Sequence, residues 1–454
     1  MVTLGLVIGR RVRSTEAFFV AGRGLGPGLL FATLLAANIG AGSTVGATGL
    51  GYRNGLAAWW WVGAAALGSL VQAAWIGPRM RRVAAAHGLQ TVGDFLEYRY
   101  SSRVRATVST ILWFGTLAIL AGQLIALSTL LTVVAGAPKW LGCLLGGVVI
   151  SLYFSAGGLL SSAWVNLVQL TVKLLGFAVA LPVALSLAGG WDAVVARAPA
   201  DPGFWSLWRN GDSGWMYLAL LGPAFVISPG LLQKIFGARD DRAVRLGVGA
   251  NALALLAYAI VPAVLGIITR SLHPDLADPQ LALPTLLVRD VPVAVGALGL
   301  AAIFSAEVSA ADAILFMLAT SLSQDLYKRF VRPDASDARV LQMARLAALA
   351  GGAAGVALAL VAQTIVGTLS FFYSVLGVCL FVPVLAGLFS RRFGAVEALA
   401  AIGAGIVVML ALQLGVVGGT GWLTPAMGGL AASLVAAGVV WAIVRGEREG
   451  RAAG

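Results

Sequence analysis

Apolar runs of about 20 residues recur along the whole chain, and they constrain its fold more than any other feature. A run of that length crosses the hydrocarbon core of a bilayer as an α-helix. The runs cover residues 28–51, 56–77, 106–134, 138–155, 160–188, 214–236, 243–269, 294–324, 340–364, 367–390, 394–416 and 421–444. Only 11% of the residues are charged, whereas a soluble domain carries roughly 25%. The sequence therefore predicts an all-α polytopic membrane protein with twelve full spans and lipid as its solvent.

The N-terminal segment 1–27 is expected to lie outside this set of spans. Residues 1–9 are apolar but too short to cross a membrane, and no signal-peptide cleavage pattern follows them. We interpret residues 1–27 as the stub of a first helix and a basic inner loop. A start codon further upstream is the alternative.

Lysine and arginine are distributed unevenly between the two sides of the predicted membrane. Of the 31 basic residues, 24 lie in alternate connections, Arg105 and Lys234 among them, and Lys173 lies inside a span. Because basic loops stay in the cytoplasm, this distribution predicts a cytoplasmic C-terminus and an inner (plasma) membrane of bacterial type. Tryptophans at the predicted outer span ends fit an interfacial belt; they are Trp59, Trp60, Trp61, Trp140, Trp205, Trp208, Trp215 and Trp422.

Composition also excludes several classes of function. The net charge of +12 comes from short clusters between apolar runs, unlike the basic face that binds nucleic acid. Cys143 and Cys379 lie in apolar spans without a CxxC motif, and a chain with two histidines is a poor candidate for a His-based metal site. No catalytic motif indicates an enzyme, and no cofactor is expected. We expect a monomer or a weak homo-oligomer that binds a small organic solute within the bilayer.

Two of the predicted spans are interrupted near their centres. Span 28–51 contains Asn38-Ile39-Gly40-Ala41-Gly42-Ser43, and span 214–236 contains Ser228-Pro229-Gly230. Glycine and proline weaken the helical hydrogen-bond ladder and free backbone groups to bind a ligand. The second break follows the first by five spans, so the two helices cross in opposite directions, as in transporters with inverted repeats. We predict repeats at 28–188 and 214–390, followed by two trailing helices in 391–454.

Several motifs resemble those of the sodium:solute symporter family, the relatives of sodium/proline, sodium/glucose and sodium/sialic acid cotransporters. They occur in the family's order over most of residues 10–400. They are Phe18-Phe19-Val20-Ala21-Gly22-Arg23, Ala37-Asn38-Ile39-Gly40-Ala41-Gly42, Thr91-Val92-Gly93-Asp94-Phe95-Leu96, Gly157-Gly158 with Trp164, Asn166 and Gln169, Pro229 with Gln233-Lys234 and Ala238-Arg239, and Ser309, Asp312 and Asp325-Leu326-Tyr327.

This resemblance implies a LeuT-type fold and cation-coupled symport of a small solute by alternating access. It also implies a sodium site between the first and eighth core helices. The implied ligands are the carbonyls of Ala36, Ile39 and Ala306, the Ser309 hydroxyl and a hydroxyl at position 310. Carbonyl and hydroxyl oxygens are the ligands that a hard cation prefers. The two breaks indicate the substrate site, with candidates Asn38, Gly40, Gly42, Phe225, Ser228, Pro229 and Gln233; packing is the alternative for Phe225 and Gln233.

The chain departs from the family pattern at the implied sodium site. Position 310 is Ala310, so one hydroxyl ligand is missing, and the acidic residue usual in the fifth core helix is Asn166. Lys173 lies two turns from Asn166 on the same helix face. Ionisable groups at this depth are functional candidates, here Lys173 with Asp312 and Glu307. Sodium coupling stays the first expectation, and sodium-independent or proton-coupled transport, with Lys173 in place of sodium, is the alternative. A structural ion pair with Asp312 or Glu307 is a second interpretation of Lys173.

Three further interpretations are plainer. Asp325 is expected to be a solvated helix end, and the aromatic group Phe371-Phe372-Tyr373 either gates the pathway or packs. A membrane sensor module is a remote alternative to transport. The sequence does not identify the substrate, because the expected site is lined by small and apolar residues without an arginine.

Overall fold

The computed structural model describes residues 15–154, 159–208, 214–418 and 423–453. The predicted stub at 1–9, the Gly157-Gly158 motif and Trp422 lie outside these residues. The described chain is all-helical, apart from an isolated β-bridge between Leu25 and Ala238. Ten of its helical segments are long and apolar enough to cross a membrane. The all-α membrane architecture is therefore confirmed, whereas the count of twelve spans stays a prediction.

The longer helical segments fall in the predicted apolar runs. In chain order the helices are α2 (Thr15–Val20), α3 (Pro27–Asn38), α4 (Ala47–Asn54), α5 (Trp59–Val71), α6 (Gly77–Ala86), α7 (Val92–Arg99), α8 (Ser102–Ala135), α9 (Lys139–Phe154), α10 (Leu159–Leu187), α11 (Gly190–Arg197), α12 (Met216–Ile227), α13 (Pro229–Phe236), α14 (Asp241–Tyr258), α15 (Ile260–Leu272), α16 (Ala282–Arg289), α17 (Val293–Thr320), α18 (Asp337–Val361), α19 (Ile365–Phe389), α20 (Ala395–Gln413) and α21 (Pro425–Ala453). The short helices α2, α7, α11 and α16 lie outside the predicted runs, and α6 overlaps one only at Gly77. The shorter apolar helices α3 and α9 fall in runs 28–51 and 138–155.

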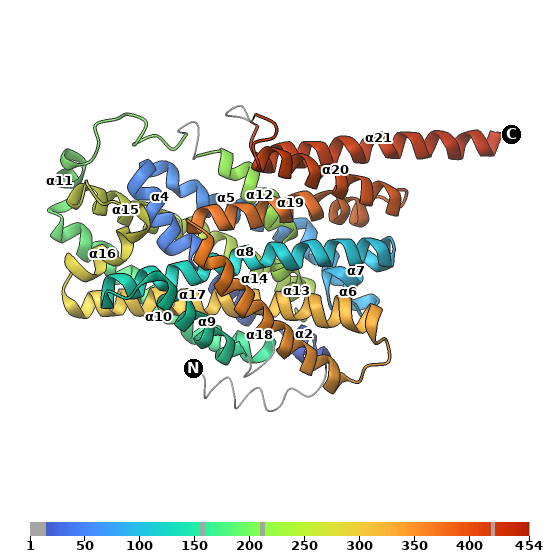
Figure 1. The fold of residues 1–454 in the computed structure, drawn as a ribbon, viewed down its shortest axis with the longest axis horizontal. Helices are drawn as coiled ribbons and strands as arrows, with labels where there is room; N and C mark the ends of the chain where they lie inside the picture. The colour runs from blue at the N-terminus through green and yellow to red at the C-terminus, as the bar shows by residue number, and fades with distance from the viewer. Residues whose placement is uncertain (1–14, 155–158, 209–213, 419–422, 454) are drawn as a thin grey trace.

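Burial separates a core from a periphery (Figure 1). About 72% of the apolar window of α8 is buried inside the protein, but only 22% of that of α21. The trailing helices α20 and α21 pack together along one edge, and α21 extends beyond the rest of the body. Exposed apolar side chains such as Val407 and Val435 on these helices suit contact with lipid. The trailing pair therefore lies at the periphery of the core.

Both predicted helix breaks are present. Helix α3 ends at Asn38, Ile39 is extended with φ −91° and ψ 92°, and a short π-helix at Gly42–Gly46 leads into α4. The second break is at Ser228, with φ −51° and ψ 120°, between α12 and α13. The π-helix and α13 both contact α17. The interruptions therefore lie beside the predicted span 294–324, as the sequence indicates.

Side chains from other helices satisfy the freed backbone groups. The Ala41 N–H donates to Gln123 Oε1 at 2.9 Å, and the Tyr258 hydroxyl donates to the Ser43 carbonyl at 3.1 Å. At the second break, Gln72 Nε2 donates to the carbonyls of Phe225 and Val226 at 3.2 Å each. Irregular backbone at membrane depth is stable only when its polar groups are satisfied in this way. These contacts hold the two breaks open as parts of one site.

Candidate functional site

The side chain of Lys173 occupies the place that the sequence assigns to a sodium ion. Lys173 lies in α10 and is fully buried. Its ammonium donates to the Ala36 carbonyl at 2.6 Å, the Ile39 carbonyl at 3.0 Å and the Ser309 hydroxyl at 2.5 Å. We call the space between these three oxygens the cation position. Three of the implied sodium ligands therefore converge on one lysine nitrogen.

The other implied ligands lie close by but do not contact Lys173. The Ala306 carbonyl accepts a hydrogen bond from the Ser309 hydroxyl at 3.0 Å. Ala310 has no hydroxyl, and its methyl group faces the first break, 2.5 Å from where a side chain at Gly40 would begin. The cation position therefore has one hydroxyl oxygen, from Ser309.

The three other coupling candidates surround the cation position without forming the ion pair considered from the sequence. Glu307 Oε1 accepts from the Thr44 hydroxyl at 2.9 Å, and its buried Oε2 has no partner among the described residues. Asp312 accepts from the Ser162 hydroxyl at 2.5 Å. Glu307 interacts electrostatically with Lys173, but no salt bridge joins Lys173 to a carboxylate in the described part of the chain. That interpretation of Lys173 as half of a structural ion pair is wrong.

Asn166 continues a buried polar stripe along α10. Its Nδ2 donates to the Thr33 hydroxyl at 3.1 Å and to the Ser162 hydroxyl at 3.3 Å. Asn166 Oδ1 and both polar side-chain atoms of Gln169 are buried without partners in the residues described. Such groups in a native protein require an explanation, often an ordered water. The stripe therefore connects Lys173 with Asp312 through polar side chains.

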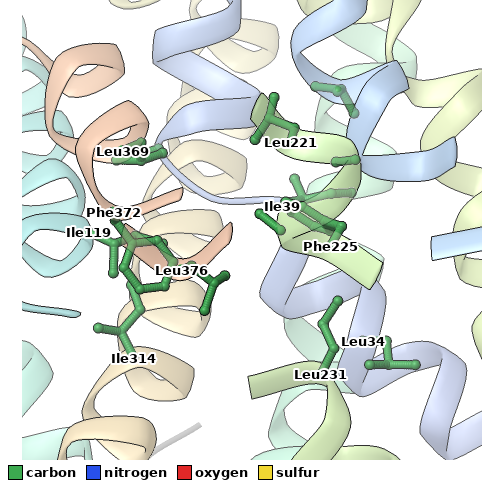
Figure 2. Packing of buried hydrophobic residues seen from close by; sticks show 14 of the residues in the cluster. Leu34, Ile39, Ile119, Leu221, Phe225, Leu231, Ile314, Leu369, Phe372 and Leu376 are labelled. Carbon is green, nitrogen blue, oxygen red and sulfur yellow. The ribbon is translucent and has the colours of Figure 1, made fainter. Parts of the chain in front are cut away.

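A cavity lies between the two helix breaks, and we call it the main cavity. Its volume is about 90 Å³, counted as space for the centres of water molecules, and one water needs roughly 10–15 Å³ on that measure. Figure 2 shows Ile119, Ile314, Leu369 and Phe372 facing Leu221, Phe225 and Leu231 across it. The predicted substrate residues Asn38, Gly40, Gly42, Phe225 and Ser228 line this cavity.

The other two predicted substrate residues are elsewhere. Pro229 and Gln233 line a second cavity of about 50 Å³, and Gln233 Nε2 donates to the Thr320 hydroxyl at 3.3 Å. Met317 and Phe372 line both cavities and so separate them. Gln233 does not line the main cavity, because α13 turns its side chain toward Thr320 of α17.

Two residues that the sequence placed at the surface line the main cavity instead. Lys234, counted among the cytoplasmic loop residues, is 4% exposed and donates to the Thr33 carbonyl at 2.8 Å. Trp61, assigned to the outer interfacial belt, is 3% exposed. Both assignments are wrong, because α13 and α5 turn these side chains toward the centre of the protein. Hydropathy alone carries no signal for that direction.

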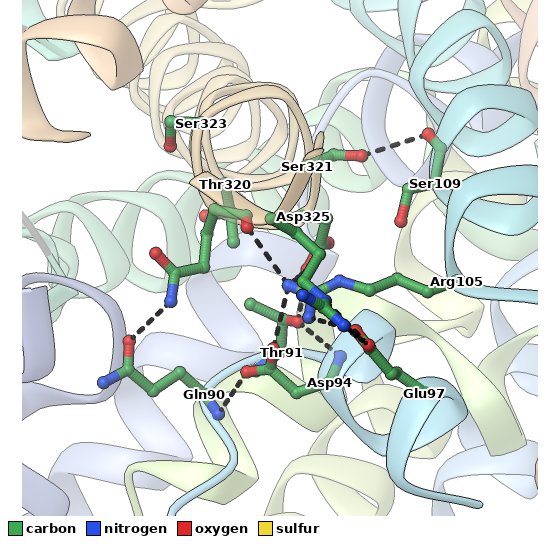
Figure 3. A network of polar contacts seen from close by, with 12 residues as sticks. Gln90, Thr91, Asp94, Glu97, Arg105, Ser109, Thr320, Ser321, Ser323 and Asp325 are labelled. Atoms are coloured by element: carbon green, nitrogen blue, oxygen red, sulfur yellow. Dashed lines mark hydrogen bonds and ion pairs between the residues drawn. The ribbon is translucent and has the colours of Figure 1, made fainter. Parts of the chain in front are cut away.

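A buried ion-pair network lies beside the second cavity, which Asp325 lines (Figure 3). Arg105 pairs with Asp94 at 2.8 Å, Glu97 at 2.9 Å and Asp325 at 2.9 Å. Asp325 also accepts from the Thr91 hydroxyl at 2.6 Å and is 6% exposed. The interpretation of Asp325 as a solvated helix end is therefore wrong. The network ties α7 and α8 to the π-helix Ser321–Val331 that follows α17, on the side predicted to be cytoplasmic.

Glu97 extends this network toward the surface. It also accepts from Arg329 at 2.6 Å. Partial burial opposes ionisation, but the hydrogen bonds from Arg329 and Arg105 hold the pKa of Glu97 below its ordinary value. A carboxylate with a lowered folded-state pKa stabilises the fold above its unfolded pKa and loses that contribution as the pH falls through the lowered value. Glu97 is therefore charged at neutral pH, and its contribution to the network is lost as the pH falls through its lowered pKa.

Comparison with known proteins identifies the family. The model of the sodium:solute symporter family matches residues 18–405. The chain belongs to this family. It is 28% identical to the sodium/glucose cotransporter of Vibrio parahaemolyticus, with 74% of this chain and 67% of that protein covered. It is also 28% identical to the sodium/pantothenate symporter of Escherichia coli (strain K12), covering 78% and 76%, and 26% identical to the high-affinity proline transporter PutP of Bacillus subtilis (strain 168), covering 90% of each.

The fold agrees with that of solved symporters. A substrate-bound, outward-open Na⁺-coupled sialic acid symporter matches with a TM-score of 0.81 and 17% identity, over 97% of this chain and 95% of that one. MHP1, a nucleobase-cation-symport-1 family transporter, matches with a TM-score of 0.63 and 15% identity, over 95% and 94%. This sodium:solute symporter family member is an integral membrane protein with a LeuT-like transporter fold.

The ion-pair network leads to the first testable prediction for this symporter-family protein. Asp325→Asn removes one of the three carboxylates that pair with the buried Arg105. Because Asp94 and Glu97 remain, the cost should lie below the roughly 3–5 kcal/mol of a buried charge left without a partner. We expect the second cavity to open more often toward the predicted cytoplasmic side. A cysteine at Ser109, which lines that cavity, should then react with a membrane-impermeant maleimide at least about tenfold faster in inside-out vesicles.

Two features make this labelling experiment interpretable. The native Cys143 and Cys379 are both fully buried, so background labelling should be low. Glu16→Gln is the matched control, because its pair with Arg23 at 3.9 Å is exposed and such pairs contribute about 0–1 kcal/mol. Equal labelling of the Asp325→Asn variant and the control would show that the network does not close the cavity.

Proposed function

We propose that this protein is a small-solute transporter in which the protonated Lys173 side chain replaces the coupling sodium ion. The observation that supports this proposal is the ammonium at the cation position, within 3.0 Å of Ala36, Ile39 and Ser309 oxygens. An ammonium and a sodium ion carry the same charge and suit the same carbonyl and hydroxyl oxygens. Transport is then coupled to a proton, or proceeds without sodium.

Sodium and the Lys173 ammonium exclude each other at the cation position. Two positive charges a few ångströms apart repel strongly in a protein interior. The loss of a hydroxyl ligand at Ala310 weakens the site for sodium, whereas the three oxygens present match the three donors of an ammonium. The family's general use of sodium favours the alternative, in which Lys173 leaves the site when sodium binds.

The proton has a mechanical effect in this proposal. Protonated Lys173, from α10, joins the break in the first core helix to Ser309 of α17. A neutral amine has one donor fewer and no charge to attract the carbonyls. Loss of the proton therefore weakens the contact between α3 and α17. The released proton can move toward Asp312 along the polar stripe at Asn166 and Gln169.

Alternating access then follows from movement of the two predicted repeats, 28–188 and 214–390, about the main cavity. The main cavity holds the solute, the second cavity is its exit, and the ion-pair network around Arg105 closes that exit. We place the C-terminus and this exit in the cytoplasm, on the basis of the basic loops. Movement of a repeat against its partner around a fixed site is the usual form of such transport.

Uptake into proteoliposomes tests the proposal. Sugars, amino acids and monocarboxylates should be screened with sodium or choline as the external cation, and with or without an inward proton gradient. We expect uptake of at least one solute to respond to the proton gradient and to be equal in sodium and choline. The same comparison in Lys173→Ala decides the alternative, because a steep sodium dependence that is unchanged in that variant would contradict the proposal.

A further inference from the structure

We infer that the main cavity binds a small organic anion, a monocarboxylate with an apolar tail. This inference rests on the proposed function, since it takes the main cavity as the transport site. Lys234 is the one charged side chain among the described residues that line the cavity, and no carboxylate lines it there. A buried positive charge facing a cavity without acidic side chains favours an anionic ligand.

The Lys234 ammonium has donors left for that ligand. Among the described residues it donates to the Thr33 carbonyl at 2.8 Å, and an ammonium has three N–H groups. Asp312 interacts with it electrostatically, but the Asp312 carboxylate is bound to Ser162 of α10 at 2.5 Å. Ser162 thus holds the Asp312 carboxylate, no salt bridge joins it to Lys234 among the described residues, and two donors of Lys234 remain available in the cavity wall.

Two neutral polar groups that line the cavity offer free donors, beside the Asn38 amide and the hydroxyls of Ser43, Ser228 and Tyr373. Gln123 accepts the Ala41 N–H through Oε1, which fixes its amide so that Nε2 is the free group. The Trp61 indole N–H has no partner among the described residues and points at Gly42, 3.0 Å from where a side chain would begin. Since an indole nitrogen can only donate, the Trp61 N–H and the Gln123 Nε2 group both complement a carboxylate oxygen.

The start of α13 adds backbone donors at the same place. Ser228, Gly230 and Leu231 line the main cavity, and the Ser228 side chain does not cap the helix. The first N–H groups of a helix have no partner within it, and the helix dipole favours an anion at that end. The N-terminus of α13 and Lys234, about one turn further along, therefore act on the same region.

The remaining wall limits the tail of the ligand. Ile119, Leu221, Phe225, Leu369 and Phe372 present apolar surface to the cavity. Its volume of about 90 Å³ corresponds to several waters, which suits a carboxylate with a short aliphatic chain. A large or polyhydroxylated solute does not fit this combination of size and lining.

Calorimetric titration of the purified full chain in detergent tests the inference without interference from the passage of free acid through lipid. The probes are butyrate, butyramide, which has nearly the same shape but no charge, and glucose. We expect butyrate to bind at least about tenfold more tightly than butyramide, as hydrogen bonds to a charged group suggest, and glucose not to bind. Lys234→Gln should remove the preference for butyrate.

Two further variants control for misfolding and for general effects on ligand binding. Trp61→Phe keeps an aromatic ring, removes the N–H and should weaken the binding of butyrate more than that of butyramide. Lys139→Gln is the matched control, because Lys139 also donates to a backbone carbonyl, that of Ala362 at 2.6 Å, but does not line the cavity. It should keep the preference for butyrate.

The outcomes separate this inference from the proposed function. Any of four results would contradict the inference that the cavity binds an anion. They are equal binding of butyrate and butyramide, binding of glucose alone, binding of none of the probes, and an unchanged preference for butyrate in Lys234→Gln. None of these results concerns sodium or Lys173, so the proposed function would still depend on the proteoliposome experiment. Sodium-driven uptake of a monocarboxylate would support the anionic substrate but contradict the proposed role of Lys173 in coupling.

Discussion

The double variant Lys173→Ala with Ala310→Ser should transport its solute in a sodium-dependent way. The alanine vacates the cation position and leaves the Ala36 and Ile39 carbonyls and the Ser309 hydroxyl without the ammonium. The serine restores the hydroxyl that the family pattern has at position 310. Oxygen ligands of this kind suit a hard cation, so replacing choline by sodium should raise uptake by at least about tenfold, measured in proteoliposomes with no pH gradient.

The single variant Lys173→Ala should lose proton-driven accumulation by roughly 100-fold, because each hydrogen bond from a charged group contributes about 1.5–3 kcal/mol and the proton carrier itself is gone. Exchange of solute at equal concentrations, which needs no coupling, should be reduced less. Lys139→Ala serves as the control for loss of a lysine bound to a carbonyl. Retained proton-driven accumulation in Lys173→Ala would contradict the proposed coupling.

The sequence predicts the helices and their breaks because lipid imposes a simple rule on them. A span must be apolar and about 20 residues long, so the limits of α8, α17 and α19 follow from composition. Glycine and proline mark the places where backbone groups are freed, and both breaks occur at such residues. The contact of Lys173 with Ala36, Ile39 and Ser309 could also be predicted. The family resemblance implied the ligand positions, and the helical spacing placed Lys173 at the same depth in the membrane.

The direction of side chains near span ends could not be predicted in the same way. Lys234 lies near the end of the apolar run 214–236 and is counted with the loop residues, but α13 turns it into the protein, where it contacts Thr33, 201 residues earlier in the chain. Arg105 and Asp325 meet across 220 residues. Nothing in a single sequence pairs residues at such separations. The donor-rich lining of the main cavity therefore emerged only from the structure.

Gly40→Ala should reduce transport strongly without preventing insertion into the membrane. A methyl group at position 40 would lie 2.5 Å from the Ala310 side chain and 3.0 Å from Gln123 Oε1. Overpacking of this kind costs about 1–3 kcal/mol, which corresponds to roughly 5- to 150-fold in an equilibrium. Because Gln123 also holds the Ala41 N–H at the break, the loss should be at the upper end. Initial uptake rates, normalised to the amount of protein in the membrane, measure it.

A second substitution distinguishes a local clash from a general defect. Ala310→Gly removes the side chain that the new methyl group would strike at 2.5 Å, leaving the milder contact with Gln123, so the pair Gly40→Ala with Ala310→Gly should recover much of the uptake. Gly377→Ala is the matched control, because a methyl group there meets nothing within 4 Å, and it should transport normally. If Gly40→Ala were as active as Gly377→Ala, the first break would tolerate bulk, and the main cavity could not be where the solute passes.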